Sequence, residues 1–268
     1  MKEIITDLEK LLFASKPIKL VKEDGSLNKE EIDSIVKELS DVLNSSESIL
    51  VLAAPQIGID ARVVCIKFSD GIKTFINPII TKKSNYVIKP ETCSSMPGKE
   101  ILITRPEEVT VVYYTEALKY EENKLLGIAA RLMDQAYQFL DGVTPAELGL
   151  VSDIKEDGPL SELTEDEFKQ VVEIYKKFVK SKIATLEKNI TEDPELAKEY
   201  RQLKFSESVI NGKAAIVGAD PKELDGYNKI QTSTALINKS MSDQQKAYNR
   251  EQVRNIANKS RKHKGKRK

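Results

Sequence analysis

Three short stretches carry the residue types from which a metal site for hydrolysis can be built. They read LAAPQIG at 52–58, ETCSSMPG at 91–98 and AARLMDQAYQFLDG at 129–142. Two histidines at i and i+4 on a helix, with a cysteine thiolate from another segment, hold a metal and leave a position open for water. The second stretch supplies Cys93, but the third contains no histidine. The only histidine of the chain is His263.

The order of these stretches resembles the peptide deformylase family, which carries GxGLAAPQIG, EGCLS and QHExDHLxG in the same order. The connecting text is similar too, with FINPII at 75–80 and TRPEEVTVVYY at 104–114. The resemblance covers residues from about 5 to 150. It implies a hydrolase that removes the formyl group from the N-terminal methionine of new chains. It also implies a divalent metal held by one Cys and two His, a Glu as general acid and base, and a Gln with a backbone N–H that polarise the formyl carbonyl.

Carried over position by position, the resemblance fails at the reacting centre. Cys93 matches the Cys ligand, but Gln135 and Phe139 stand at the two His positions. Ala136 stands at the position of the Glu, and Gln138 replaces the Asp that would orient a ligand. An amide is a weak neutral ligand and a phenyl ring is none, so we expect no catalytic residue, no metal and no cofactor.

The first motif is altered as well. Ile49 and Val51 stand where the family has two glycines, and their branched side chains would fill the groove beside the site. Gln56 and the Ser94 backbone N–H match the pair that polarises a carbonyl. Two interpretations of Gln56 stay open: it could hold a ligand carbonyl, or its amide could cap nearby backbone groups.

The other residues of the third stretch are expected to be structural. Phe139, Leu132 and Ala136 continue one apolar helix face, which predicts that the metal cavity is repacked as core. Asp134 and Asp141 are expected to be exposed, and we do not expect them to form a new metal site.

Periodicity predicts the elements that position these residues. A helix is expected over 28–43, where apolar residues recur at helical spacing and Asn28 with Glu31 suggests a capping box. A second helix is expected over Leu125–Leu140. Between them lie a short apolar run, Ile49–Ala54, and four predicted strands: Arg62–Phe68, Lys73–Ile76, Glu100–Thr104 and Val109–Tyr114. Residues 1–150 are therefore predicted to form an α+β domain, with a mostly antiparallel sheet packed on a central helix as the resemblance implies.

Residues 151–268 are predicted to form a mainly helical extension, joined through a linker at 149–162. Thr164 and Glu167 open a long helix that reaches about Lys188, by the capping-box pattern. Asp193-Pro194 can begin another helix, and Ser242–Lys259 predicts a third with a thin apolar face. Residues 205–240 give no assignment.

Composition excludes some classes of protein and leaves others open. The 268 residues are 40% hydrophobic and 31% charged with a formal net charge of zero, which is typical of a globular protein. Two cysteines, Cys65 and Cys93, indicate buried thiols in a reducing compartment. The first residues lack the apolar core of a signal peptide, and no apolar run is long enough for a membrane helix. We therefore expect a cytoplasmic or virion protein, with no membrane partner.

A basic tail at 259–268 is the main asymmetry of charge. It is predicted to be a solvated tail, or an arm for nucleic acid or an acidic surface. Its cationic residues are Lys259, Arg261, Lys262, Lys264, Lys266, Arg267 and Lys268.

Three functional hypotheses follow. The first is a non-catalytic, deformylase-like structural or interaction protein in a larger assembly, for example a phage tail or baseplate. The second is a factor that binds ribosomes, nascent chains or RNA. The third is an active metal-dependent deformylase with altered chemistry.

Overall fold

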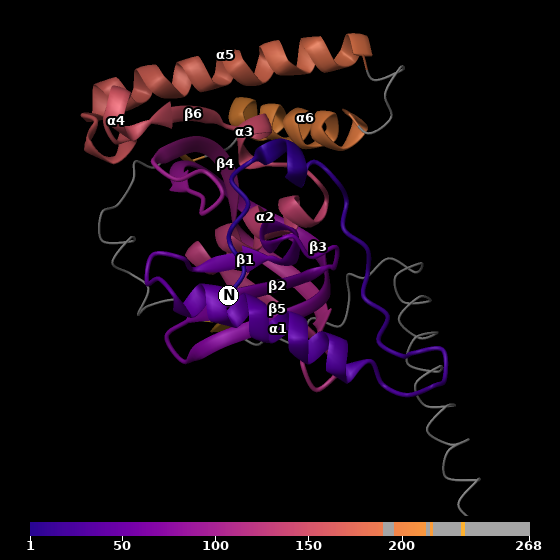
Figure 1. Ribbon diagram of the computed structural model, residues 1–268. Helices are drawn as coiled ribbons and strands as arrows, with labels where there is room; N and C mark the ends of the chain where they lie inside the picture. Colours follow the sequence, from indigo (N-terminus) through magenta and orange to yellow (C-terminus); the bar gives the residue numbers. More distant parts are fainter. Residues whose placement is uncertain (190–195, 213–214, 217–231, 234–268) are drawn as a thin grey trace, which may run out of the picture.

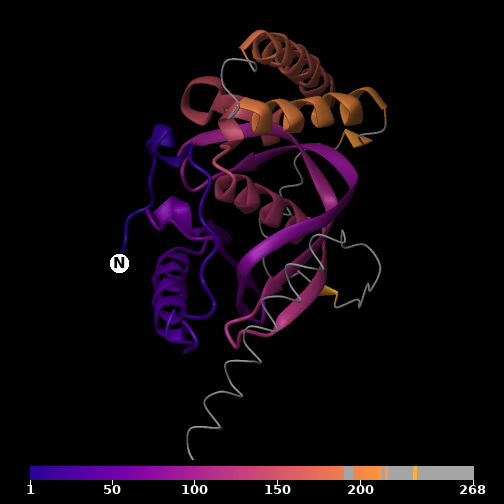
Figure 2. The ribbon, with the colours of Figure 1, turned by 90° about the vertical axis from the view of Figure 1, so that its right-hand side faces the viewer.

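A curved, mostly antiparallel sheet wraps around one central helix in the computed structural model of the chain (Figures 1 and 2). The structure describes residues 1–189, 196–212, 215–216 and 232–233. The strands follow the order β1-β2-β3-β4-β5-β8, with β6 paired to β4 and β7 to β3. Their bounds are β1 Val51–Ala53, β2 Val63–Phe68, β3 Gly71–Thr92, β4 Lys99–Tyr114, β5 Tyr120–Leu126, β6 Leu150–Asp153, β7 Ala215–Ile216 and β8 Thr232–Ser233. The α+β expectation is confirmed.

Two long strands give the sheet its curvature. Strands β3 and β4 pair in antiparallel fashion from Ile76↔Tyr114 to Thr92↔Glu100, with irregular register at Ile76/Ile79 and Ile80/Lys82. The sequence predicted only short pieces of them, and it missed β5. In β3 the bulges shift the alternation of polar and apolar residues, so this one bent strand reads as separate segments.

Helices cover both faces of the sheet. Helix α1 (Lys29–Asn44) packs its apolar face on one side, against Leu52, Val63 and Cys65. Helix α2 (Ile128–Leu140) packs on the other side, where it contacts β1, β2, β4 and β5. The predicted start of the second helix at Leu125 was wrong, because Leu125 lies on β5 and pairs there with Val109 of β4.

The predicted capping box of α1 takes a different form. The Asn28 side chain makes no cap hydrogen bond to the helix backbone. Its amide instead donates to the Lys19 carbonyl at 2.9 Å and to the Glu31 carboxylate. Asn28 therefore ties the preceding loop to the helix and does not satisfy a free N–H of the first turn.

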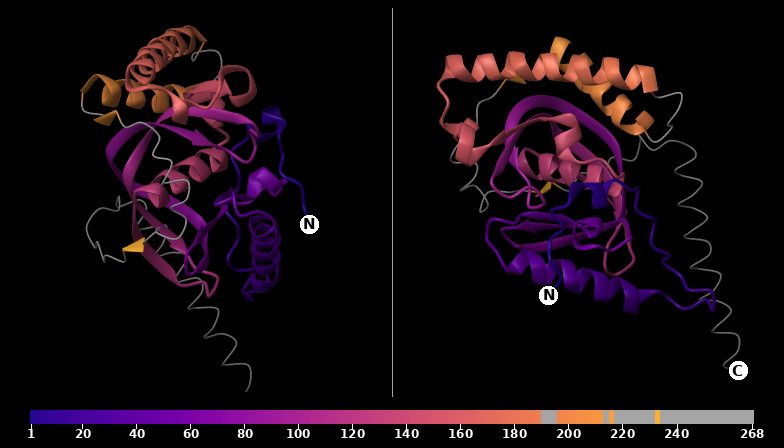
Figure 3. Two further views of the ribbon diagram at one scale, coloured as in Figure 1. Left: turned by 90° about the vertical axis from the view of Figure 1, so that its left-hand side faces the viewer. Right: turned by 45° about the horizontal axis from the view of Figure 1, so that its top comes forward.

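The extension packs on the same body. It contains α3 (Pro145–Leu148), β6, α4 (Ile154–Asp157), α5 (Glu165–Asn189) and α6 (Leu196–Gly212). Figure 3 shows α5 and α6 lying together across one end of the curved sheet, above α2. The capping box of α5 forms as predicted, since the Thr164 hydroxyl and backbone N–H both donate to Glu167.

Residues 149–162 are not the linker that their composition suggested. Leu150–Asp153 extends the sheet by pairing with Lys99–Leu102. The Glu100 carboxylate, which is buried, accepts a hydrogen bond from the Leu160 backbone. A Cβ on Gly149 would collide with the Ile101 side chain, so a glycine lets the chain pass close to β4. The division into two domains at residue 150 stays a prediction.

Several expectations fall outside the described residues. They include the Asp193-Pro194 helix start, the Ser242–Lys259 helix and the basic tail at 259–268. Residues 205–212, which received no assignment, belong to α6. Across the described chain, no helix is both long enough and apolar enough to cross a membrane.

Candidate functional site

The three motif stretches meet beside α2, as the resemblance implied. Gln56 lies on a short 3-10 helix after β1, and Cys93 follows directly after β3. The buried Gln56 side chain is engaged at both ends. Its Oε1 accepts from the Ala53 backbone at 3.0 Å, and its Nε2 donates to the hydroxyls of Ser94 at 3.3 Å and Ser95 at 3.1 Å. This geometry matches the capping interpretation of Gln56.

Gln135, at the first histidine position, is also tied into the structure. Its Nε2 donates to Glu91 Oε1 at 2.9 Å and to the Thr92 carbonyl at 3.1 Å. The side chain is only 4% exposed. Gln135 thus links α2 to the end of β3 through two hydrogen bonds.

Phe139 and Ala136, at the second histidine and glutamate positions, are fully buried in the main hydrophobic core. They pack with Met133, Leu140 and the inward-facing residues of the sheet. Leu132, expected on the same apolar face, is half-buried and lies at the edge of a pocket. Apolar packing therefore occupies the space that the family's histidine and glutamate would need.

The residues present do not fit a metal ion. Burial raises the pKa of the Cys93 thiol to about 12, and the Glu91 carboxylate acts in the same direction. The thiol is therefore neutral near pH 7 and is not poised as a nucleophile. Among the described residues, no group of three or more His, Cys, Asp and Glu could hold a metal ion. Cys65 is likewise a buried thiol, with a pKa raised to about 12 by burial.

A buried network of charges lies directly beside these positions. Arg105 is fully buried and donates to both oxygens of Glu91, at 2.8 and 2.5 Å. Its Nη1 donates to Asp134 at 2.8 Å and to Gln138 Oε1 at 2.7 Å. Asp134 also pairs with Lys83. Burial alone would raise the pKa of Asp134, but the charges of Lys83 and Arg105 outweigh it and lower the pKa.

The expected exposure of Asp134 was therefore wrong, because a buried cation compensates its charge. Asp141 is not fully exposed either: it is half-buried and pairs with Arg62 at 2.9 Å. Arg105, Glu91 and Lys83 are the residues that sequence reasoning missed. An arginine inside the apolar strand ILITRP could have indicated the network, since a buried arginine needs carboxylate partners.

A pocket of about 410 Å³ remains next to the replaced site. Ile49 and Val51 line it together with Cys93, Ser94 and Gln135. The two branched residues form part of its wall, but they do not fill the groove as expected. Apart from these, its lining includes Ile4, Met96, Lys99, Leu132 and Ile154.

The fold and the motif positions define the class: an α+β domain with a curved, mostly antiparallel sheet around one central helix, on which three motif stretches come together. Residues 1–148 match the family model described as Polypeptide deformylase, and the chain belongs to that family. A peptide deformylase from Dehalococcoides mccartyi is 30% identical over 165 residues, covering 60% of this chain and 95% of the relative. Another, from Picosynechococcus, is 33% identical over 141 residues, covering 48% of this chain and 74% of the relative.

Solved structures of peptide deformylases share the fold of this chain. A peptide deformylase from Legionella pneumophila is 22% identical with a TM-score of 0.50, covering 55% of this chain and 85% of that protein. The family match ends at residue 148, so it does not include β6, α5 and α6.

Proposed function

We propose that this chain is a non-catalytic member of the deformylase family that serves as a structural or interaction protein in a larger assembly. One observation carries the proposal. Gln135, Ala136 and Phe139 occupy the positions of two metal ligands and the general base, and all three are buried within ordered packing. A fold can persist after its chemistry is lost when another surface is selected.

The remaining polar groups support binding and not turnover. Hydrolysis of a formamide needs an activated water and a group that transfers its proton. The Ala136 methyl group can neither activate a water nor transfer a proton. The amide oxygen of Gln56 already accepts a hydrogen bond from the Ala53 backbone N–H. A site that only holds a carbonyl lowers no barrier unless it binds the transition state more tightly.

The helical extension favours a role in an assembly. Helices α5 and α6 enlarge the molecule beyond the family domain, and the sequence ends in the basic tail at 259–268. A virion, such as the tail or baseplate of a large phage, is one setting for such a protein. If that setting is right, we expect purified phage particles to contain the protein at a fixed stoichiometry. Absence of the protein from the particles would rule out the virion setting.

Metal content and activity test the proposal together. The full-length protein, purified without chelators, is analysed for transition metals and assayed with a formyl-Met peptide. The Dehalococcoides relative serves as a positive control under the same conditions. We expect neither stoichiometric metal nor turnover. One equivalent of metal together with turnover would establish the active hydrolase and refute the proposal.

A second candidate is a factor that binds ribosomes, nascent chains or RNA. The basic tail and the pocket beside Ser94 favour it, because a chain end could enter the pocket while the tail contacts phosphates. Removal of residues 259–268 should then weaken RNA or ribosome binding and reduce its salt dependence. An unchanged affinity and salt slope would eliminate this candidate.

A further inference from the structure

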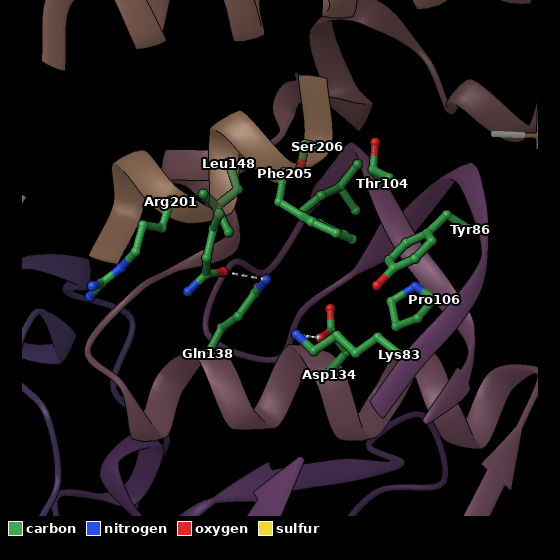
Figure 4. Close-up of a pocket in the computed structure, with 12 residues that line it drawn as sticks. Lys83, Tyr86, Thr104, Pro106, Asp134, Gln138, Leu148, Arg201, Phe205 and Ser206 are labelled. Carbon is green, nitrogen blue, oxygen red and sulfur yellow. Dashed lines mark hydrogen bonds and ion pairs between the residues drawn. The ribbon is translucent and has the colours of Figure 1, made fainter. Parts of the chain in front are cut away.

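A second pocket, of about 390 Å³, lies where the extension meets the family domain (Figure 4). Strands β3 and β4 and helix α2 supply one side through Tyr86, Pro106 and Asp134. Helix α6 supplies the other through Arg201 and Phe205. None of its lining residues lines the pocket beside Cys93 and Gln135, so the two pockets are distinct.

The walls of the pocket suit a flat ring. The Tyr86 and Phe205 rings meet edge to face with their centroids 4.9 Å apart. Phe205 is 47% exposed, so its ring is accessible to a ligand that enters the pocket. Ile103, Pro106 and Leu148 complete the apolar lining.

The uncommitted polar groups of the pocket can all donate a hydrogen bond. Burial and the Asp134 carboxylate raise the pKa of Tyr86, so its hydroxyl stays protonated, and Figure 4 shows it directed into the pocket. This hydroxyl, the Ser206 hydroxyl and the Gln202 Nε2 have no hydrogen-bond partner among the residues that the structure describes. The acceptors are already in use: Gln138 Oε1 accepts from Arg105, and Gln202 Oε1 accepts from Gln138.

The charges of the pocket favour an anion. Lys83 and Arg201 are the cations of its lining, and Asp134 is the only acid. Asp134 pairs with Lys83 and shares the buried Arg105 with Glu91, so these four charges balance and Arg201 adds one further positive charge to the lining. Arg201 is exposed, with no partner in the described chain, and its guanidinium lies at the outer side of the pocket in Figure 4. An exposed arginine changes rotamer rapidly and can turn towards a bound anion.

We propose that this pocket binds a small ligand in which a planar ring is joined to one anionic group, either a carboxylate or a phosphate. The ring would lie against Tyr86 and Phe205, and the anion would face Lys83, Arg201 and the Tyr86 hydroxyl. Pockets of this size class hold small molecules and combine apolar walls with a few polar groups in the same way. The inference does not depend on the loss of deformylase chemistry.

Calorimetric titration of the full-length protein tests the proposal. The probes are 2-naphthoate and adenosine monophosphate, each compared with its neutral analogue, 2-naphthalenemethanol and adenosine. We expect saturable binding of one equivalent of at least one anion, with its neutral analogue about tenfold weaker or more. Binding of naphthoate alone identifies an aromatic carboxylate as the ligand chemistry, and binding of the monophosphate alone identifies a nucleotide.

Variants place the binding in this pocket. Arg201→Gln should weaken the anion about fivefold, and Phe205→Ala should weaken both members of a pair about tenfold. The matched controls are Lys204→Gln, on the same helix, and Ile174→Ala, which removes a 52% exposed apolar side chain from α5. The altered residues are exposed, so unchanged thermal unfolding confirms that each variant is folded. Absence of binding by both anions, equal binding of the neutral analogues, or equal effects of the controls would overturn the proposal.

Discussion

Residue exchanges in the third motif keep a carboxylate and an amide beside the buried Arg105. The family order QHExDHLxG places an amide and an acid at the positions that Asp134 and Gln138 occupy in this chain. The two side chains have exchanged types, yet Arg105 Nη1 contacts both, at 2.8 and 2.7 Å. In this chain's order, acid then amide, Arg105 has one carboxylate partner on α2, and the family's order, amide then acid, would also offer it one. We expect this network to stabilise the fold, because the fully buried Arg105 needs carboxylate partners.

Reversing this exchange tests that explanation. Asp134→Gln alone should cost about 3 kcal/mol of unfolding free energy, because Arg105 loses a buried carboxylate partner. Adding Gln138→Asp should return the stability to within about 1 kcal/mol of the unaltered protein, since the carboxylate again faces Arg105. Lys83 tolerates the exchange because its side chain is 30% exposed and can be hydrated. Urea unfolding measures all three variants.

The control for the exchange is Asp33→Asn, which breaks an exposed pair with Lys29 and should change stability little. Additive losses in the double variant would show that the two positions do not share Arg105 as a common partner.

Restoring the family's reacting residues should damage the protein. The triple variant Gln135→His, Ala136→Glu, Phe139→His places polar groups in space that is now fully apolar at positions 136 and 139. Buried groups without partners cost about 1–3 kcal/mol each, and loss of a buried phenyl ring adds to this. We expect an unfolding free energy lower by more than 3 kcal/mol, with or without added zinc.

A single Leu132→His variant is the matched control, because Leu132 lies on the same helix but only half-buried at the pocket edge. A triple variant that binds one zinc ion and unfolds at the same urea concentration as the unaltered protein would mean that the metal cavity is intact.

At the scale of elements, the sequence predicted helices well and bent strands poorly. Helix α1 and the start of α5 were predicted within a residue or two, because local spacing and capping residues determine them. The continuous β3 was missed because its bulges break the alternation. Strand β6 was missed because a pairing with β4 leaves no trace in its own four residues. The place of the three motif stretches beside one another could be predicted from the sequence, but the partners of Arg105 come from distant segments and could not.

One buried hydroxyl contributes to the contact between α5 and β4. Tyr175 is fully buried, and its hydroxyl oxygen accepts from the Thr104 backbone N–H at 3.1 Å. Tyr175→Phe should cost ~1–3 kcal/mol, because that buried N–H loses its partner. Tyr175→Ala should cost ~3–5 kcal/mol through the cavity that it leaves. Thermal and urea unfolding measure both losses.

Tyr200→Phe provides the control, since it removes an equivalent hydroxyl that bonds Glu187 in an exposed position. If the two Tyr→Phe variants have equal stability, the Tyr175 hydroxyl does not contribute to docking of α5.

For the whole molecule, the core is continuous between the family domain and the extension. The main cluster joins Met133 and Phe139 of α2 with Val172, Tyr175 and Val179 of α5. The views in Figures 1 and 3 agree that α5 and α6 cover one end of the curved sheet. A shared core predicts one cooperative unfolding transition, whereas two separate domains would give two.

Removal of residues 150–268 distinguishes these alternatives. Truncation exposes the β4 residues Ile101 and Ile103, which are buried in the cluster that α5 completes, and leaves the β4 edge at Lys99–Leu102 without β6. Each lost burial of a large apolar side chain is worth ~1.5–3 kcal/mol, and total stabilities are ~5–15 kcal/mol. The shortened chain should therefore unfold at clearly lower urea or aggregate through the exposed edge. Removal of only 259–268 is the control and should leave the transition unchanged. A shortened chain as stable as the full protein, with a separate transition for the extension, would instead establish two independent domains.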